Sequence, residues 1–203
     1  MVLLKKNNMR SLLIFFLLST SLTFSQHSKD EVLKYQDDLK EFYVNPDTTP
    51  LKTEELNEFI GINFFPFSED YIVKAKIEYV KNEPVFKMAS TGKRQQDYRR
   101  FAILHFELFG QKEQLEVYQN IALSEREGFE DSYFLPFLDF TNGEFTAEQG
   151  RYIDLKIPKN ATEITLNFNL AYHPYCAYSH GYSCPITPFV NLINQSVDAG
   201  VKY

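Results

Sequence analysis

An alternation of apolar and polar residues with a period of two dominates this chain after residue 60. Its clearest stretch runs over 163–170, where every second residue is Ile, Leu or Phe and the others are Glu, Thr or Asn. Such a period places successive side chains on opposite faces of a strand, one face buried and one solvated. The pattern is typical of antiparallel sheets that cover one core.

Further strand candidates are separated by turn signals and lie at 71–79, 85–89, 99–109, 115–123 and 153–157. The turn at Lys81-Asn82-Glu83-Pro84 predicts a hairpin of the first two. A parallel α/β fold needs helices between strands, and no helical pattern follows residue 60. We therefore expect a mainly β fold, an antiparallel β-sandwich or partly open barrel.

Helical signals are confined to the region before residue 60. Ser28 and Glu31 form a capping-box pattern, and apolar residues then recur at helical spacing, which predicts one N-terminal helix that ends before Pro46. A second short turn of helix is expected over 53–59, with Gly61 available as its C-cap.

The N-terminus has the order of a secretory signal peptide. Lys5, Lys6 and Arg10 precede the apolar run 12–18, and small polar residues follow. The run is shorter than the ~20 residues that span a bilayer. We expect residues 1–25 to be a cleaved signal peptide and 26–203 to be a single mainly β domain. Because no cysteine stands at the expected cut to carry a lipid, the product has no membrane anchor and is exported, to the periplasm or outside the cell.

The charge of the chain excludes one class of partner. The sequence holds 21 Lys and Arg against 27 Asp and Glu, and all three basic residues of the expected signal peptide are lost on cleavage. The mature net charge is then about −9. Nucleic-acid binding relies largely on neutralising phosphates, so this chain is predicted to bind no nucleic acid.

Cys176 and Cys184 are the two cysteines of the chain. In an exported protein, a disulfide between them is the default expectation, and a pair of free thiols is one alternative. The competing interpretation is a zinc site, because His173 and His180 alternate with the cysteines. Their spacing, H-x2-C-x3-H-x3-C, matches no standard zinc finger or ribbon, so we expect no metal and no other cofactor.

A second polar cluster lies upstream at Asp139-Phe140-Thr141-Asn142-Gly143 and Gly150-Arg151-Tyr152. Asn-Gly is a strong turn signal, and Asp and Thr beside it readily bond local backbone. The structural interpretation is an elaborate turn in which Arg151 pairs with Asp139 or Glu144. The functional one is a pocket where the Arg151 fork receives an anionic group.

These two regions resemble the bacterial domain of unknown function 1684 family, over roughly residues 29–200. The segment FLPFLDFTNGEFTAEQGRY is similar to that family's F-x-D-x-T-x-G-x-x-T-Y-x-x-G-R-Y motif. The segment LNFNLAYHPYCAYSHGYSCPITPFVN is similar to its D-F-N-x-A-Y-N-P-x-C-A-Y and C-P-x-P-P-x-E-N motifs, and Ala199-Gly200 to its A-G-E ending. The family name implies no activity.

The chain departs from the family pattern at four positions. Val190 and Val201 replace two glutamates, His173 replaces an asparagine, and Ala147 replaces an aromatic residue. If the glutamates act in catalysis or metal binding, this chain has lost that function, since valine transfers no proton and binds no cation. If they only complete a buried arginine pairing, apolar replacements are tolerated.

Two functions remain open. The favoured one is a non-catalytic module that binds an unknown small molecule in a polar-aromatic pocket. Its candidate ligand-binding residues are Asp139, Thr141, Arg151, Tyr152, Asn169, Tyr172 and Asn191. The alternative is a hydrolase with Asp139 as base and Arg151 facing a developing negative charge. A tight Asp139–Arg151 pair buried away from any cleft would argue against both uses of these two residues.

Overall fold

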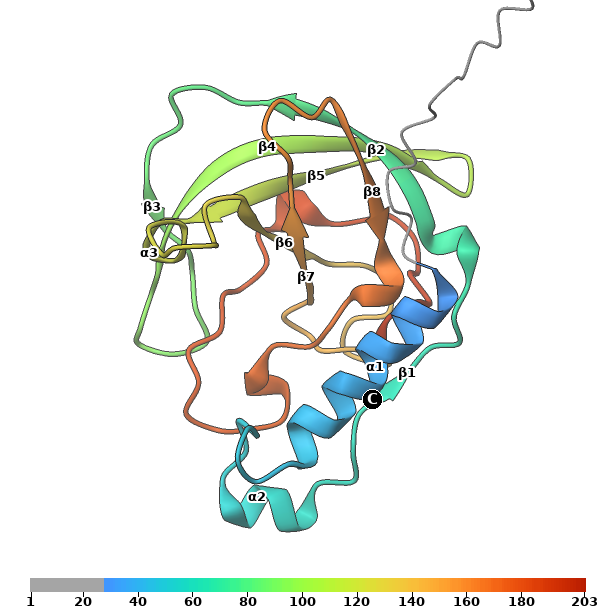
Figure 1. Cartoon of the computed structure of the whole chain (residues 1–203), viewed down its shortest axis with the longest axis vertical. Helices are drawn as coiled ribbons and strands as arrows, with labels where there is room; N and C mark the ends of the chain where they lie inside the picture. Colours follow the sequence, from blue (N-terminus) through green and yellow to red (C-terminus); the bar gives the residue numbers. More distant parts are fainter. Residues whose placement is uncertain (1–27) are drawn as a thin grey trace, which may run out of the picture.

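The computed structural model describes residues 28–203 and has a curled, half-barrel sheet of antiparallel strands at its centre (Figure 1). The strand order is β7-β6-β5-β4-β2-β8, and β3 pairs with β4. The strands are β2 (Ile72–Tyr79), β3 (Phe86–Lys87), β4 (Asp97–Leu108), β5 (Gln111–Asn120), β6 (Ser132–Phe137), β7 (Arg151–Lys156) and β8 (Glu163–Asn167). The predicted mainly β fold is confirmed, in its partly open form, with β7 and β8 at the two edges.

The inward faces of these strands form the main core. In β7, Ile153 and Leu155 join that core, and in β8 Ile164 and Leu166 do so. The same alternation sends Tyr152, Asp154 and Lys156 to the opposite face of β7. One face of β7 therefore belongs to the main core, and the other face is available to line the candidate site.

Helix α1 (Lys29–Val44) runs diagonally across the lower right of Figure 1 and contacts the segment that follows β8. The predicted capping box at Ser28 and Glu31 is present. The second helix, α2 (Thr53–Glu58), ends at Phe59 in an extended conformation, so Gly61 is not its C-cap. A third, α3 (Ile121–Ser124), follows β5 directly, so the strand predicted over 115–123 ends at Asn120 and a helical turn that the sequence did not predict replaces its last residues.

Short elements complete the chain. Strands β1 (Asn63–Phe64) and β9 (Val201–Lys202) form a separate two-stranded sheet. Single 3-10 turns lie at Glu69–Tyr71, Phe168–Leu170, Tyr175–Ala177 and Phe189–Asn191. The turn at Phe168–Leu170 ends the strand predicted over 163–170 three residues early, because the chain leaves the sheet there to pass under α1.

One sequence prediction of strand pairing is wrong, and one strand of the main sheet was missed. The segment 85–89 forms only the two-residue β3, and it pairs with β4 rather than with β2, so the predicted hairpin does not exist. Strand β6 was not predicted. Its sequence SYFLPF has no polar alternation, because Leu135 and Phe137 pack in the main core while Phe134 packs on the other face with Tyr98 and Tyr118.

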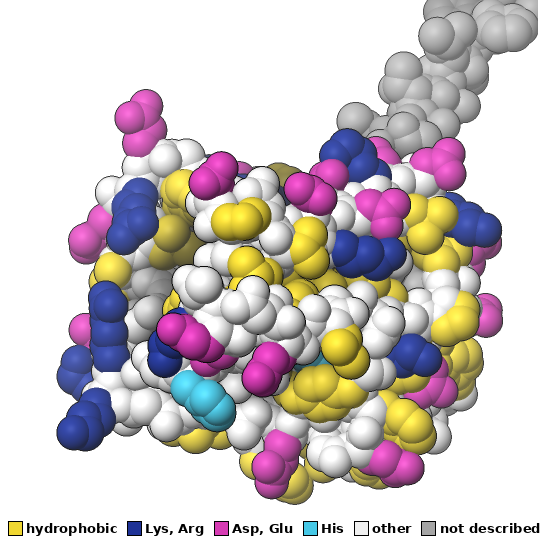
Figure 2. Space-filling view, turned by 90° about the horizontal axis from the view of Figure 1, so that it is seen from below, with side chains coloured by type: hydrophobic (Ala, Val, Ile, Leu, Met, Phe, Trp, Pro, Cys, Tyr) yellow, Lys and Arg dark blue, Asp and Glu magenta, His cyan; other side chains and the backbone are white. Residues whose placement is uncertain are grey.

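The expected signal peptide lies outside the described residues. Within 28–203, no helix has the length and apolar character to cross a membrane. Viewed from the α2 end, hydrophobic side chains are exposed between charged side chains of both signs (Figure 2).

Candidate functional site

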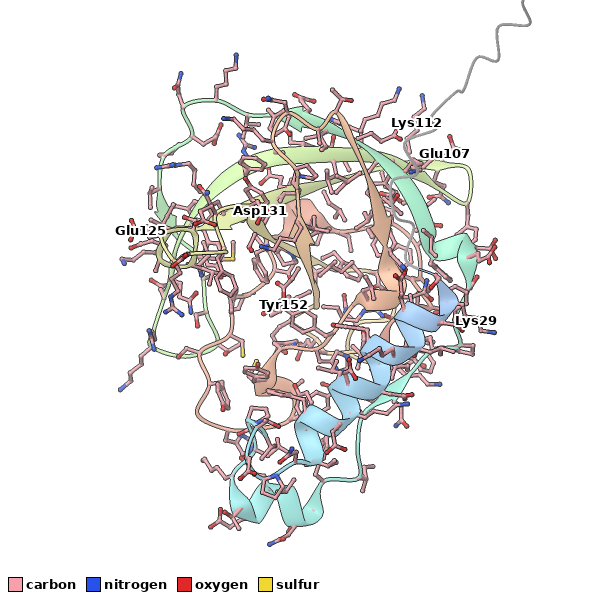
Figure 3. The ribbon with its side chains drawn as sticks, viewed as in Figure 1. Lys29, Glu107, Lys112, Glu125, Asp131 and Tyr152 are labelled. Atoms are coloured by element: carbon pink, nitrogen blue, oxygen red, sulfur yellow. The ribbon has the colours of Figure 1, made fainter. Side chains whose placement is uncertain are left out.

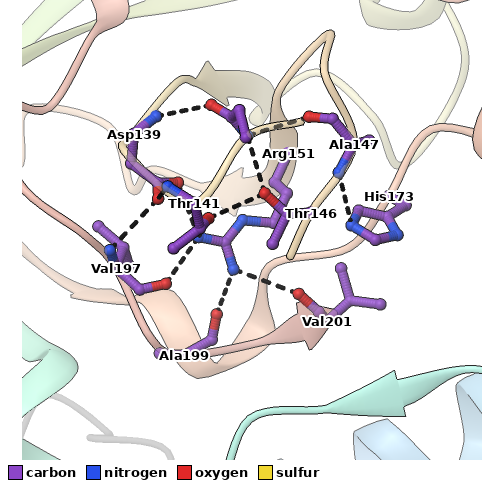
Figure 4. A network of polar contacts seen from close by, with 10 residues as sticks. Asp139, Thr141, Thr146, Ala147, Arg151, His173, Val197, Ala199 and Val201 are labelled. Carbon is purple, nitrogen blue, oxygen red and sulfur yellow. Dashed lines mark hydrogen bonds and ion pairs between the residues drawn. The ribbon is translucent and has the colours of Figure 1, made fainter. Parts of the chain in front are cut away.

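The predicted pair of Asp139 and Arg151 forms the centre of a buried polar network (Figure 4). Arg151 Nη2 donates to Asp139 Oδ2 at 2.7 Å, and both side chains are 0% exposed. The guanidinium also donates to the backbone carbonyls of Val197, Ala199 and Val201. Its role is therefore to hold the C-terminal segment against β7, and no cleft reaches it.

Val201, one of the positions noted above as a departure from the family pattern, contributes to this network only through its backbone carbonyl. The Val201 side chain is 1% exposed and packs in the apolar cluster of Tyr43, Leu51 and Ile62. Because Asp139 already balances the guanidinium charge, a valine is accommodated here without an unpaired charge.

The turn between Asp139 and Arg151 is built by short side chains, as the structural interpretation expected. Asp139 Oδ1 accepts from the Thr141 backbone N–H at 2.8 Å, and the Thr141 and Thr146 hydroxyls bond each other at 2.9 Å. Gly150 has φ of +97°, and a Cβ there would lie 2.5 Å from the Phe137 carbonyl oxygen. The glycine is therefore required by backbone conformation and by space.

Two other predicted binding residues, Asn169 and Asn191, are also fully buried and bonded to backbone. Asn169 donates from Nδ2 to the Ser68 carbonyl, and its Oδ1 accepts from the Ser68 N–H. Asn191 bonds the N–H and carbonyl of Glu116 and the carbonyl of Pro136. Asn191 bridges β5 and β6, Asn169 fixes the segment at Ser68, and the side-chain polar atoms of both asparagines have protein partners.

His173 is likewise a structural residue. Its Nε2 accepts from the Ala147 N–H at 3.1 Å, and its Nδ1 lies 2.7 Å from the Tyr178 hydroxyl. Burial, and then the nearby Arg151 charge, lower the pKa of His173 to about 3. Among residues 28–203, no group of three or more His, Cys, Asp and Glu side chains is arranged to hold a metal.

Cys176 and Cys184 lie next to each other as free thiols. The Cys176 N–H donates to Cys184 Sγ at 3.2 Å. A hydrogen bond with the Cys184 thiol lowers the pKa of Cys176 to about 7, and the same bond raises the pKa of Cys184. The predicted disulfide between them stays a prediction, and the two residues are placed where it would form.

The remaining predicted residues, Tyr152 and Tyr172, line a cavity of about 650 Å³. The cavity lies between the outer face of β6 and β7, the α3 region and the loop 172–185. Figure 3 shows Tyr152 near the centre of the ribbon, between β7 and that loop. Aromatic residues dominate its lining and include Tyr98, Phe134, Tyr152, Tyr172, Tyr175 and Tyr182.

The loop is fixed around Tyr152 at both of its ends. At its start, Tyr172 and Tyr152 exchange backbone hydrogen bonds of 2.9 Å each. At its far end, the Tyr152 hydroxyl donates to the Pro185 carbonyl, and Ile186 N–H donates to the Ala89 carbonyl at 2.8 Å. The loop is thus bonded to Tyr152 of β7 at its start, and to Tyr152 and the backbone of Ala89 at its end. Because both ends of the loop are held in this way, the cavity is preformed.

Asp154 is the one carboxylate among the described residues that line this cavity. Its side chain is reached by solvent within the cavity, yet protein atoms surround it on most sides, and this burial raises its pKa. The Tyr172 hydroxyl donates to Asp154 Oδ2 at 3.0 Å and opposes that rise. Sequence reasoning missed Asp154, although its polar position between Ile153 and Leu155 indicates the outer face of a strand.

A second hollow of about 490 Å³ lies on the sheet over β2, β4 and β5. Charged side chains of both signs line it, among them Lys74, Lys76, Lys112, Glu107, Glu113 and Glu163. It has one aromatic lining residue besides His105, namely Phe106. The aromatic cavity is the more specific site, since ligand pockets are mostly apolar with few placed polar groups.

Comparisons with known proteins agree with this fold. The model of the family described as "Protein of unknown function (DUF1684)" matches residues 57–202. A solution structure of an uncharacterised protein from Haloarcula marismortui is similar with a TM-score of 0.66 at 30% identity, and the match covers 86% of this chain and 93% of that one. No match was found among curated proteins.

Proposed function

The chain belongs to the DUF1684 family, whose description assigns no activity, and from that premise we propose that it is an exported, non-catalytic module that binds a small molecule. The observation that carries the proposal is the preformed aromatic cavity around Tyr152, whose volume of about 650 Å³ suits a small organic ligand. Export follows from the signal-peptide pattern, and an acidic surface fits a partner other than nucleic acid.

The site of the module differs from the one the sequence favoured. Tyr152 and Tyr172 stay in it, while Asp139, Thr141 and Arg151 hold the C-terminal segment and Asn169 and Asn191 bond backbone. Asp154 joins the site from the same face of β7 as Tyr152. The cavity thus combines several rings with few polar groups, the usual composition of a ligand site.

The alternative hydrolase has no support in this geometry. A base must come within hydrogen-bond reach of the proton that it removes. The side chains of Asp139 and Arg151 are 0% exposed and bond each other, so a substrate reaches neither.

The proposal is tested with a variant that fills part of the cavity and with a measurement of small-molecule binding. Ser132 lies on β6 among the residues that line the cavity, so Ser132→Phe would occupy part of it. Thr162→Phe places the same ring on an exposed residue that does not line the cavity and serves as the control. Wild type and both variants, without residues 1–25, would be screened by NMR against a library of aromatic and aliphatic small molecules.

We expect hits whose chemical-shift changes centre on Tyr152, which Ser132→Phe abolishes and Thr162→Phe retains. Hits that bind the Ser132→Phe protein equally well, or no hits at all, would overturn the proposal.

A further inference from the structure

The charge of the aromatic cavity is set by two of its lining residues, Asp154 and Lys156. Lys156 Nζ bonds Asp131 Oδ1 at 2.6 Å and the Gly128 carbonyl at 2.9 Å, so its charge is already balanced. Asp154 has the Tyr172 hydroxyl as its bonding partner, and within residues 28–203 no Lys or Arg lies at ion-pair distance from it. The cavity therefore carries one unbalanced negative charge.

Rings surround that charge. The Tyr172 and Tyr152 rings lie 5.8 Å apart and perpendicular, and the Tyr152 and Phe134 rings lie 4.7 Å apart. Burial raises the pKa of Tyr35, Tyr98, Tyr172 and Tyr175, and the negative charge of Asp154 adds to the rise for each. The hydroxyls of four tyrosines, from α1, β4 and the loop 172–185, thus lie in the field of one carboxylate.

This combination favours a positively charged ligand over a neutral one. The Asp154 carboxylate is accessible to solvent and has no counter-ion, so a cation bound in the cavity could pair with it where protein atoms limit screening by water. The faces of aromatic rings attract cations as well. An anion would meet repulsion from Asp154 and from the rings alike.

We propose that this cavity binds an organic cation, an amine or ammonium group on an apolar body, with Asp154 as its counter-ion and the tyrosine rings as its walls. This inference rests on the proposed function and names its ligand class. The apolar body follows from the cavity volume, which exceeds what the charged group alone would fill.

The experiment compares two probes of nearly the same shape, benzylamine, which is protonated at neutral pH, and benzyl alcohol, which is neutral. Both would be titrated into the full mature protein by NMR. We expect wild type to bind the amine at least about tenfold more tightly than the alcohol, from one partly buried charge pair with ring contacts.

The matched variants are Asp154→Asn and Glu130→Gln. The first keeps an acceptor for the Tyr172 hydroxyl but removes the charge, so we expect the preference for the amine to disappear. The second removes the charge of an exposed carboxylate that lies outside the cavity lining and leaves the Lys156–Asp131 pair intact, so it should keep the preference.

A pH titration of the wild-type protein supplies a measurement that needs no variant. Burial raises the pKa of the Tyr98, Tyr152, Tyr172 and Tyr175 hydroxyls, and the hydrogen bond with Cys176 raises that of the Cys184 thiol, so below about pH 6 these groups stay neutral while benzylamine stays charged. Asp154 is then the cavity group that changes charge, so amine binding should weaken as pH falls while alcohol binding stays constant.

The outcomes separate the two proposals. Equal binding of amine and alcohol at the Tyr152 cavity would overturn the cation inference and leave the binding module standing. Binding of neither probe would count against both. Retention of the amine preference in Asp154→Asn would also overturn the cation inference, because the counter-ion would then lie elsewhere.

Discussion

Asp139 and Asp154 are carboxylates with opposite surroundings at the two ends of a short stretch of chain. Asp139 is fully buried and paired with Arg151, while Asp154 faces a cavity with a tyrosine hydroxyl as its partner. The first arrangement stabilises the fold. The second leaves a charge that does not stabilise the fold, which is typical of a binding site.

This contrast predicts opposite effects of two Asp→Asn changes on the free energy of unfolding, measured in urea at pH 7. Asp139→Asn leaves the buried Arg151 charge without its partner and should cost about 3 to 5 kcal/mol. Asp154→Asn should cause no loss, and a gain is expected. Because the folded-state pKa of Asp154 is raised, its charge opposes folding once the pH exceeds that pKa.

Equal losses in the two variants would contradict this assignment. A urea midpoint of Asp139→Asn equal to that of the wild type would also contradict it, since the ion pair would then contribute little to stability.

His173 predicts a pH dependence of stability. Its pKa is about 3 in the folded protein and about 6.5 when unfolded, so the unfolded state binds the extra proton first. Its stabilising contribution is present above pH 6.5 and is lost as pH falls toward 3, by up to about 1.4 kcal/mol per pH unit. Urea unfolding at several pH values measures this slope.

The matched variant is His173→Asn, which restores the residue that the family pattern has at this position. It should unfold with a shallower dependence on pH in that window. Parallel curves for the two proteins would mean that His173 is not held neutral by the fold.

At the scale of elements, the loop 172–185 decides whether the cavity exists. Tyr172 begins it with backbone bonds to Tyr152, and Cys184 and Pro185 return it to the sheet, where Cys184 N–H donates to the Thr91 hydroxyl at 3.1 Å. The alternation in 163–170 predicted the strand that leads into this loop. It did not predict the path of the loop, which depends on partners around residue 90.

The cysteines of this loop give a prediction about its covalent state. The hydrogen bond with the Cys184 thiol lowers the pKa of Cys176, which raises its thiolate share at neutral pH and so its reactivity toward an oxidant. We expect the exported protein, isolated without reductant, to show no reactive thiol in a titration under denaturing conditions and two after reduction. Cys176→Ser provides the control, with one thiol before and after reduction.

Two reactive thiols in the unreduced protein would show that the pair stays reduced. In the oxidised form, the bond would hold the cavity wall in place by closing a short loop.

At the scale of the whole molecule, the half-barrel is held together by side chains where its ladder of backbone bonds is weakest. Strands β5 and β6 share a single register pair, Tyr118 with Phe134. Beside it, the Asn191 amide bonds Glu116 of β5 and Pro136 of β6, each at 2.8 Å or less. The C-terminal segment thus closes the gap between two parts of the sheet.

Asn191→Ala should therefore destabilise the entire fold rather than one loop. It leaves buried backbone groups of both strands without partners, at about 1 to 3 kcal/mol for each. Thermal unfolding followed by circular dichroism measures the loss, with the exposed Asn194→Ala as control. A melting temperature equal to that of the control would show that water replaces the amide.

Local periodicity determined the strands with one solvated face and the capped N-terminal helix, since each depends on neighbours in sequence. It left β6 unrecognised because both faces of that strand are covered. It did not predict that the side chains of Arg151 and Asp154 lie on opposite faces of β7. Only the tertiary structure decided that Arg151 faces the C-terminal carbonyls and that Asp154 faces a ring-lined cavity, because the burial of a side chain depends on segments distant in sequence.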